Sequence, residues 1–348
     1  MGANEKSEIK VRALLLGLIF GLDKQFWWFL VQGLIPSHLN MVATQQTKSW
    51  FQGLAELIFY GNYFYGFCAV AIMLETVFQL QIPYDGPLPY CIAFVATVLF
   101  YNYPYARNYT SPSNNPRTAW YARHHDWIVR SQWVLAVVLL FLLGWLLLMH
   151  GRQIGQISAK SWWLLLVFPV VGAMYYGSNF LSKKHNLRQI GWLKPFVIGF
   201  VWAGVSNVYP ILYHNLFFPV PYEPTFRAFL LFLKSLMFVS MLAILFDIKD
   251  YEADSENQLK TLVVKLGLQK TIFYVVFPLT LLGLLTFLSY AVHQQFSLLK
   301  MVLLMVPFFA LLAAARSLRK SRTLMYYLVV IDGLFIVKAF FGILSSVI

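Results

Sequence analysis

Charged residues are scarce in this sequence. Asp, Glu, Lys and Arg make up 12% of the 348 residues, against about 25% in an average soluble domain, whereas hydrophobic residues make up 59%. Acidic residues are the scarcer kind, with 14 against 27 Lys and Arg, which leaves a formal net charge of +13. This composition excludes an ordinary soluble domain and favours a protein embedded in a lipid bilayer.

Cysteine is also rare, and several familiar motifs are missing. The two cysteines, Cys68 and Cys91, both lie in apolar segments, which excludes a disulfide framework. The sequence contains no phosphate-binding loop, dinucleotide-binding glycine fingerprint, Ser-His-Asp arrangement or zinc-ligand spacing. It also has no short repeat, no low-complexity tract and no linker long enough to separate two soluble domains.

Long apolar runs are abundant. A helix needs about 20 predominantly apolar residues to cross a bilayer. Nine runs predict membrane-spanning helices, over residues 54–76, 88–106, 128–149, 161–178, 194–213, 226–247, 271–292, 298–315 and 324–346. The predicted fold class is therefore an all-α polytopic membrane protein with about nine transmembrane helices.

Residues 1–50 form a separate predicted unit. Residues 11–36 are apolar, but Asp23 and Lys24 interrupt them, which favours a helix lying in the membrane interface or a broken hairpin. The segment begins like a signal peptide, yet no small-residue cleavage site follows, so we expect it to stay in the mature protein. The predicted domains are a cytoplasmic and interfacial segment, 1–50, and a transmembrane domain, 51–348.

The basic residues are concentrated in alternate loops. Sixteen Lys and Arg residues lie in loops 107–127, 179–193, 248–270 and 316–323 and at the adjoining helix ends, Arg130 and Lys194. The opposite side has four: Arg152, Lys160, Arg227 and Lys300. The positive-inside rule then places the basic loops and the N-terminus in the cytoplasm and the C-terminus outside, in the plasma or inner membrane if the protein is bacterial. The surplus positive charge indicates a lipid surface, and not nucleic acid, as the partner.

Three aspartates follow the sixth predicted span, in the stretch LFDIKDYEADSENQLKTLVVKLG. Asp247, Asp250 and Asp254 are spaced i, i+3, i+7, and at roughly 100° per residue they share one face of a helix. Three carboxylates on one face repel each other, so such a face is typical of a site for a hard cation such as Mg²⁺. The alternative is a solvated helix end, because several lysines lie nearby.

Three segments of this chain resemble the UbiA superfamily of intramembrane prenyltransferases (4-hydroxybenzoate polyprenyltransferase-like). FDIKDYEADSENQLKTLVVKLG (246–267) is similar to the second aspartate-rich motif of the family. LRQIGWLKPFVIGFVWAGV (187–205) is similar to the approach to its fifth helix, and YYLVVIDGLFIVKAF (326–340) to its last helix. The resemblance implies nine helices around a central cavity open toward the cytoplasm. It also implies Mg²⁺-assisted transfer of an isoprenoid chain from a prenyl diphosphate to an aromatic or lipid-like acceptor.

The first aspartate-rich motif of that family is degenerate in this sequence. The corresponding stretch is YNYPYARNYTSPSNNPRT (101–118), where the three acidic positions fall on Tyr103, Ala106 and Thr110 if Asn102 is the motif's Asn. Arginines of this loop, Arg117 among them, could replace one metal ion because a guanidinium binds phosphate bidentately. The alternative is that they only orient the loop in the membrane.

The resemblance and the residue chemistry together name the candidate site. Asp247, Asp250 and Asp254 are the expected metal ligands and catalytic residues. The expected substrate-binding residues are Asn102, Arg117, Arg188, Lys194, Lys260, Tyr176, Trp202 and Asp332. The cations would bind the diphosphate, and the aromatic rings would line a water-free chamber for a developing carbocation. Asp332 is included because intramembrane acids are costly and usually face a cavity.

Two further features leave alternatives open. Glu75, Lys234 and Lys338 also fall within predicted spans, and a Glu75–Lys338 pair would lower the cost of burying both charges. The degenerate first motif keeps a second function in view, a non-catalytic isoprenoid- or quinone-binding relative. A transporter of hydrophobic solutes is a third, although the sequence lacks the repeat symmetry and broken midplane helices typical of that class.

The charge asymmetry predicts the topology of the chain. Cysteines introduced by Ser113→Cys and Ser255→Cys should be shielded from an impermeant thiol reagent in intact cells, and one introduced by Pro221→Cys should react. Labelling of the Ser255→Cys variant from outside would overturn the predicted orientation. The unsubstituted chain gives the background labelling.

Overall fold

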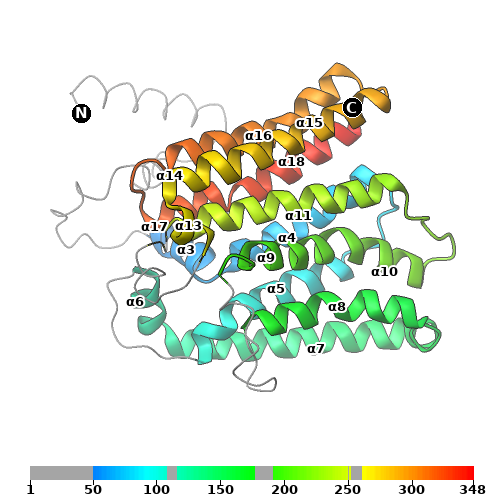
Figure 1. The fold of residues 1–348 in the computed structure, drawn as a ribbon. Coiled ribbons are helices and arrows are strands. Elements are labelled where there is room, and N and C mark those ends of the chain that lie inside the picture. Colours follow the sequence, from blue (N-terminus) through cyan, green and yellow to red (C-terminus); the bar gives the residue numbers. More distant parts are fainter. Residues whose placement is uncertain (1–49, 108–115, 177–190, 250, 252–260) are drawn as a thin grey trace.

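The computed structural model describes residues 50–107, 116–176, 191–249, 251 and 261–348, and Asp250 and Asp254 lie outside this part. Its long helices lie side by side in one bundle (Figure 1). They are α4 (Tyr63–Leu80), α5 (Leu88–Arg107), α7 (His125–Gly155), α8 (Ala159–Tyr176), α9 (Lys194–Ala203), α10 (Tyr209–Phe217), α11 (Phe226–Asp247), α15 (Phe277–His293), α16 (Leu298–Ser317) and α18 (Leu334–Val347). The described residues contain no strand, which agrees with the predicted all-α fold.

In three places, two successive α-helices are joined end to end by a short π-helical segment. The segments are η3 (Gly204–Val208) between α9 and α10, η4 (Ile272–Val276) between α14 (Leu268–Thr271) and α15, and η5 (Tyr327–Ile331) between α17 (Leu324–Tyr326) and α18. A π-helical turn widens the helix locally and frequently lies beside functional sites. In the described residues, seven helical rods are long and apolar enough to cross a membrane.

The first predicted span, 54–76, is divided in two in the structure. Helix α3 (Trp50–Tyr60) ends before Asn62, which adopts a left-handed backbone conformation with φ of 62°. Asparagine tolerates this region better than most residues, so the chain turns there and α4 begins at Tyr63. The membrane-spanning part is consequently Tyr63–Leu80, shifted toward the C-terminus of the predicted range.

The two ends of the bundle differ. The short helices α3, α6 (Pro116–Arg123), α13 (Leu262–Leu266) and α17 gather at one end, called here the α6 end (Figure 1). The chain passes from α10 to α11 at the other end, called the α10 end, where α18 also finishes. Because α9 leaves the α6 end and α11 returns to it, the first residue of α9 and the last residue of α11 can meet there.

The centre of the bundle is formed by close packing of α4, α9, α11 and α18. Gly199 of α9 lies so near α11 that an added Cβ atom would come within 2.6 Å of the Leu236 carbonyl oxygen. Phe238 and Leu245 of α11 are almost fully buried in the same core, as is Ile331 of η5. A tight seam between helices is what small residues allow in membrane proteins, where lipid is as apolar as the core.

A buried charged cluster crosses this centre toward the α10 end. The cluster, called here the Glu75 cluster, consists of Glu75 and Gln79 of α4, Lys234 of α11 and Lys338 of α18. The Glu75 carboxylate pairs with Lys338 through Oε2 and lies 3.3 Å from Lys234 Nζ through Oε1. Gln79 Nε2 donates to Oε1 at 2.8 Å. The Glu75–Lys338 pair considered from the sequence is therefore present, 263 residues apart along the chain.

Removing the carboxylate should leave buried positive charge without its partner. We expect Glu75→Gln to lower the free energy of unfolding in detergent micelles by about 3–5 kcal/mol, the usual result of breaking a buried ion pair on one side. Glu223→Gln, at an exposed glutamate, is the control and should change it by less than about 0.5 kcal/mol.

The double variant Glu75→Gln with Lys338→Met removes both charges of the most buried pair. It should be more stable than the Glu75→Gln variant, because position 338 no longer carries a buried positive charge that has lost its counter-charge. Equal losses for Glu75→Gln and Glu223→Gln would contradict a stabilising role for the cluster.

Candidate active-site pocket

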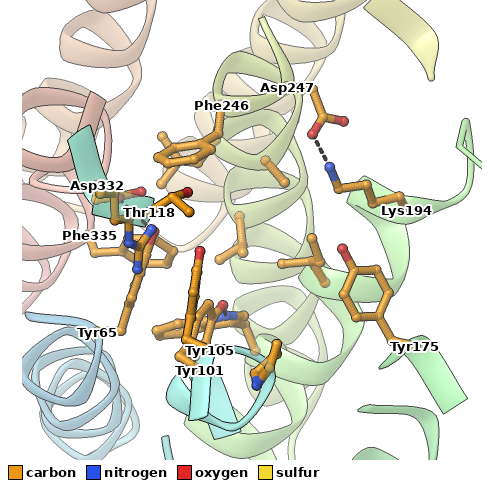
Figure 2. Close-up of a pocket in the computed structure, with 17 residues that line it drawn as sticks. Tyr65, Tyr101, Tyr105, Thr118, Tyr175, Lys194, Phe246, Asp247, Asp332 and Phe335 are labelled. Atoms are coloured by element: carbon orange, nitrogen blue, oxygen red, sulfur yellow. Dashed lines mark hydrogen bonds and ion pairs between the residues drawn. The ribbon is translucent and has the colours of Figure 1, made fainter. Parts of the chain in front are cut away.

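A cavity of about 370 Å³ lies near the α6 end of the bundle, with residues of α6 in its wall. Its walls come from α4, α5, α6, α8, α9, α11, α18 and the turn before α18, so segments far apart in sequence meet there. Figure 2 shows Lys194 and Asp247 on one side of the pocket and Asp332 with Phe335 on the other. The lining divides into a charged pair, a network that holds one arginine, and an aromatic wall.

The charged pair joins the beginning of α9 to the end of α11. Lys194 Nζ donates to Asp247 Oδ1 in an ion pair whose carboxylate is almost fully buried. Pro195 follows Lys194 in the first turn of α9, where its missing N–H costs nothing and its fixed φ favours the helix. The antiparallel packing of α9 and α11 thus brings one cation and one carboxylate to the same wall.

The arginine is Arg117 of α6. It belongs to a group of hydrogen-bonded residues, called here the Arg117 network, that consists of Tyr60, Asn62, Asn102, Arg117 and Tyr121. Its guanidinium donates to Asn62 Oδ1 and, at 3.4 Å, to the Tyr60 carbonyl oxygen. Asn62 Nδ2 donates to Asn102 Oδ1 at 2.9 Å, and Asn102 Nδ2 donates to the Gly61 carbonyl oxygen at 2.8 Å. The left-handed turn at Asn62 therefore both ends α3 and orients the arginine.

Two tyrosine rings complete the surroundings of Arg117. Its guanidinium carbon lies 5.0 Å from the ring centroid of Tyr105 and 5.9 Å from that of Tyr121. Cation–π contacts of this kind are stronger where water is excluded. Burial raises the pKa of the Tyr121 phenol, so the group stays neutral. Its hydroxyl donates to the Tyr60 carbonyl oxygen at 2.7 Å. The arginine is thus fixed in position while it still lines the cavity.

The aromatic wall consists of stacked rings whose polar atoms pair with one another. Tyr65 stacks on Tyr101 with ring centroids 4.4 Å apart, and Trp202 stacks on Phe335 at 4.6 Å. Trp202 Nε1 donates to the Tyr101 hydroxyl at 2.8 Å, and the Tyr65 hydroxyl donates to Asp332 Oδ2 at 2.7 Å. These bonds satisfy the polar tips of the rings, and the apolar surfaces remain for the cavity.

The structure brings together five of the residues selected from the sequence. Arg117, Lys194, Trp202, Asp247 and Asp332 all line this one pocket. Asn102 lies behind the wall in the Arg117 network and is fully buried. Tyr176 ends α8, and its neighbour Tyr175 lines the pocket. Asp250, Asp254, Arg188 and Lys260 lie outside the described residues.

Sequence reasoning did not single out several residues that form the pocket. They are Tyr65, Tyr101, Tyr105 and Phe335, which line it, and Asn62, which accepts a hydrogen bond from the lining residue Arg117. With 20 Tyr, 31 Phe and 11 Trp in the chain, no aromatic residue stands out by its type. The Gly61–Asn62 pair inside a predicted span was the one available signal, because a turn-forming pair is unusual there.

The described residues of the pocket include two carboxylates that could contribute to a metal site. Within the described part of the chain, no group of three or more His, Cys, Asp or Glu side chains lies close enough to hold a metal ion. Asp247 and Asp332 are the described carboxylates of the pocket, and they contact Lys194 and Tyr65 respectively. Asp247 is the last residue of α11, and the chain turns at Ile248 and Lys249, so α11 itself carries one of the three aspartates expected on a single helical face. Asp250 and Asp254 lie outside the described residues.

Comparisons with known proteins give one structural likeness. No protein-family model and no curated protein matches this sequence. A solved structure from work on digeranylgeranylglyceryl phosphate synthase in membranes is similar to this chain, with a TM-score of 0.48 and 14% sequence identity. The match covers 84% of this chain and 98% of that chain.

Proposed function

We propose that this chain is an intramembrane prenyltransferase, which moves an isoprenoid chain from a prenyl diphosphate to an aromatic or lipid-like acceptor. One observation carries the proposal: Arg117, Lys194 and Asp247 line the same cavity as a wall of stacked aromatic rings, inside a bundle of apolar helices. A prenyl diphosphate has the matching division, with a highly charged head and a long apolar chain. The resemblance of three sequence segments to the UbiA superfamily supports the same reaction.

The cations of the pocket suit the charged head. Prenyl transfer begins with ionisation of a carbon–oxygen bond, and the leaving diphosphate gains negative charge that must be stabilised. Arg117 offers a planar fork that can hold two phosphate oxygens, and Lys194 offers a compact charge with several donors. Because the Arg117 network fixes the guanidinium before any ligand arrives, little reorganisation is needed on binding.

The aromatic wall suits the other half of the reaction. Loss of diphosphate leaves positive charge on the allylic carbon, and water would quench it. Ring faces attract a cation and exclude water from its surroundings. The pocket offers four such rings. Those of Tyr65, Tyr101 and Trp202 have their polar atoms in hydrogen bonds, and Phe335 has no polar side-chain atom, so the ring faces can take this role. Because these rings lie beside the charged residues, the isoprenoid chain could extend from the diphosphate along them into the bundle.

Magnesium belongs to the proposal as an assisting ion. Asp247, the last residue of α11, would hold it together with Asp250 and Asp254 of the same aspartate-rich stretch. When bound, Mg²⁺ would offset charge on the diphosphate. In the structure Asp247 engages Lys194, so this lysine would exchange its carboxylate partner for a phosphate oxygen when the metal and diphosphate bind.

A second candidate function is non-catalytic binding of an isoprenoid or quinone. The stretch that resembles the first aspartate motif supplies Tyr105 as a cation–π partner of Arg117 and presents no carboxylate there. A pocket with less capacity to bind metal could hold the ligand without ionising it. The two functions share one site and differ in whether the carbon–oxygen bond breaks.

The decisive assay separates binding from bond cleavage. Purified protein should bind geranylgeranyl diphosphate, and with Mg²⁺ and an aromatic or lipid acceptor it should release pyrophosphate. Excess chelator should suppress the release. Binding without release for every acceptor would favour the second candidate, and failure to bind prenyl diphosphates of any length would overturn both.

The Arg117 network generates a matched mutational prediction. Arg117→Ala should weaken prenyl diphosphate binding by about 10- to 150-fold, because a charge-assisted contact contributes roughly 1.5–3 kcal/mol. Arg319→Ala, at an exposed arginine of another basic loop, should change the affinity less than about twofold. Arg117→Lys keeps the charge and should give an intermediate loss, which separates phosphate binding from simple unfolding.

The affinities should be measured by equilibrium binding in detergent, with the thermal midpoint of each variant recorded alongside. If Arg117→Ala behaves like Arg319→Ala while both proteins remain folded, Arg117 has no part in binding the diphosphate.

A further inference from the structure

A second cavity lies toward the α10 end, well separated from the candidate active site. It has a volume of about 250 Å³ and lies between α11, α15 and α16, with contributions from the ends of α4 and α18. Arg227 of α11 lines it, whereas Asp247 of the same helix lines the first pocket. Twenty residues of helix separate the two, which corresponds to about 30 Å. We call this second cavity the basic cavity.

Its polar lining carries charge of one sign. Arg227 and Lys234 of α11 and Lys300 of α16 are partly buried around it, and its described lining includes no Asp or Glu. Arg227 and Lys300 line this one space from neighbouring helices, so it meets positive charge from more than one side. Three like charges beside an apolar space are unfavourable unless an anion joins them.

The nearest carboxylate does not neutralise this charge. Lys234 Nζ lies 3.3 Å from Glu75 Oε1, but the other oxygen of Glu75 pairs with the buried Lys338. One carboxylate is therefore shared by two lysines, and the Glu75 cluster keeps one surplus positive charge. With Arg227 and Lys300 the surplus around the cavity rises to three, at the end of the bundle that has few basic residues in its loops.

The remaining walls are apolar and leave room for a chain. Leu231 and Met237 of α11 face Phe287 of α15 and Phe308 of α16 across the space. There is room beside Gly283 of α15, because an added Cβ atom would make only ordinary van der Waals contact, 3.5 Å from Phe308 and 3.6 Å from Met237. An apolar space with cations at its rim is complementary to an amphiphile whose head is anionic.

We propose that the basic cavity binds a membrane phospholipid with an anionic head group. The phosphate would lie among Arg227, Lys234 and Lys300, and one acyl chain would lie between α11 and α15. The three helices that form most of the cavity, α11, α15 and α16, belong to segments long and apolar enough to cross a membrane, which favours a phospholipid over a soluble anion as the occupant. The site is independent of the proposed prenyl transfer, whose residues lie at the other end of the bundle.

The test compares two lipids on the purified full-length protein. Native mass spectrometry from a nonionic detergent should show phosphatidylglycerol retained at least about 10-fold more tightly than phosphatidylcholine with the same acyl chains, because the choline ammonium offsets the phosphate charge and is repelled by the three cations. Arg227→Gln with Lys300→Gln should abolish this preference. The matched control, Arg152→Gln with Lys160→Gln, removes two exposed cations at the same end and should retain it.

A second variant tests the apolar part without changing charge. Gly283→Leu should fill the cavity and reduce phosphatidylglycerol retention about as strongly as the double charge variant, while the thermal midpoint in lipid-free detergent shows that the protein is folded. Inorganic phosphate at millimolar concentration should fail to displace the lipid.

The proposal would be overturned by equal retention of both lipids, by a preference unchanged in the Arg227/Lys300 variant, or by full displacement by inorganic phosphate. The last result would mean that the cations bind a free anion and that the apolar walls take no part. Loss of the preference in the Arg152/Lys160 control would equally overturn it, because general surface charge would then account for the effect.

Discussion

Burying a charged group among apolar helices costs several kcal/mol unless a partner offsets it, and here the partners come from distant parts of the chain. Glu75 of α4 meets Lys338 of α18 and Lys234 of α11, which joins three central helices at one level of the bundle. Lys194 meets Asp247 where α9 begins and α11 ends. Such pairs specify which helices lie together, because a lipid-like core alone would tolerate many arrangements.

The same constraint shapes the pocket at the α6 end. Asn62, Asn102 and Tyr121 hydrogen-bond to one another, and Asn62 accepts a hydrogen bond from Arg117, so this arginine is fixed where it lines the cavity. Tyrosine and tryptophan on the opposite wall direct their polar atoms toward Asp332 and Tyr101. The cavity consequently combines fixed positive charge with apolar ring surfaces. This combination is what an ionising prenyl diphosphate requires, and it is the basis of the proposed function.

Much of this arrangement could be predicted from the sequence. Apolar runs predicted the helices, since a span of about 20 apolar residues leaves few alternatives. Arg117, Lys194, Trp202, Asp247 and Asp332 were selected from four separate segments, and the structure places all five around one cavity. Charged residues in a membrane protein are few and costly, so each one that occurs carries information about a site.

The remaining features depend on contacts that sequence patterns do not encode. The turn at Asn62 interrupts an otherwise uniform apolar run, and the aromatic wall uses four rings out of 62 Phe, Tyr and Trp residues. Rings of equal apolarity can lie against lipid or line a cavity, and only the packing of the helices decides between the two. The basic cavity could not be predicted from the sequence either, because Arg227 and Lys234 lie on one helix and Lys300 on another that is remote in sequence.

The most direct test of the central claim is an experimental structure with a thio analogue of a prenyl diphosphate, whose carbon–sulfur bond resists ionisation. The account predicts the diphosphate within hydrogen-bond distance of Arg117 and Lys194, near Asp247, with the prenyl chain along Trp202 and Phe335. A diphosphate bound elsewhere, for example at Arg227 and Lys300, with the first pocket holding no ligand, would contradict it.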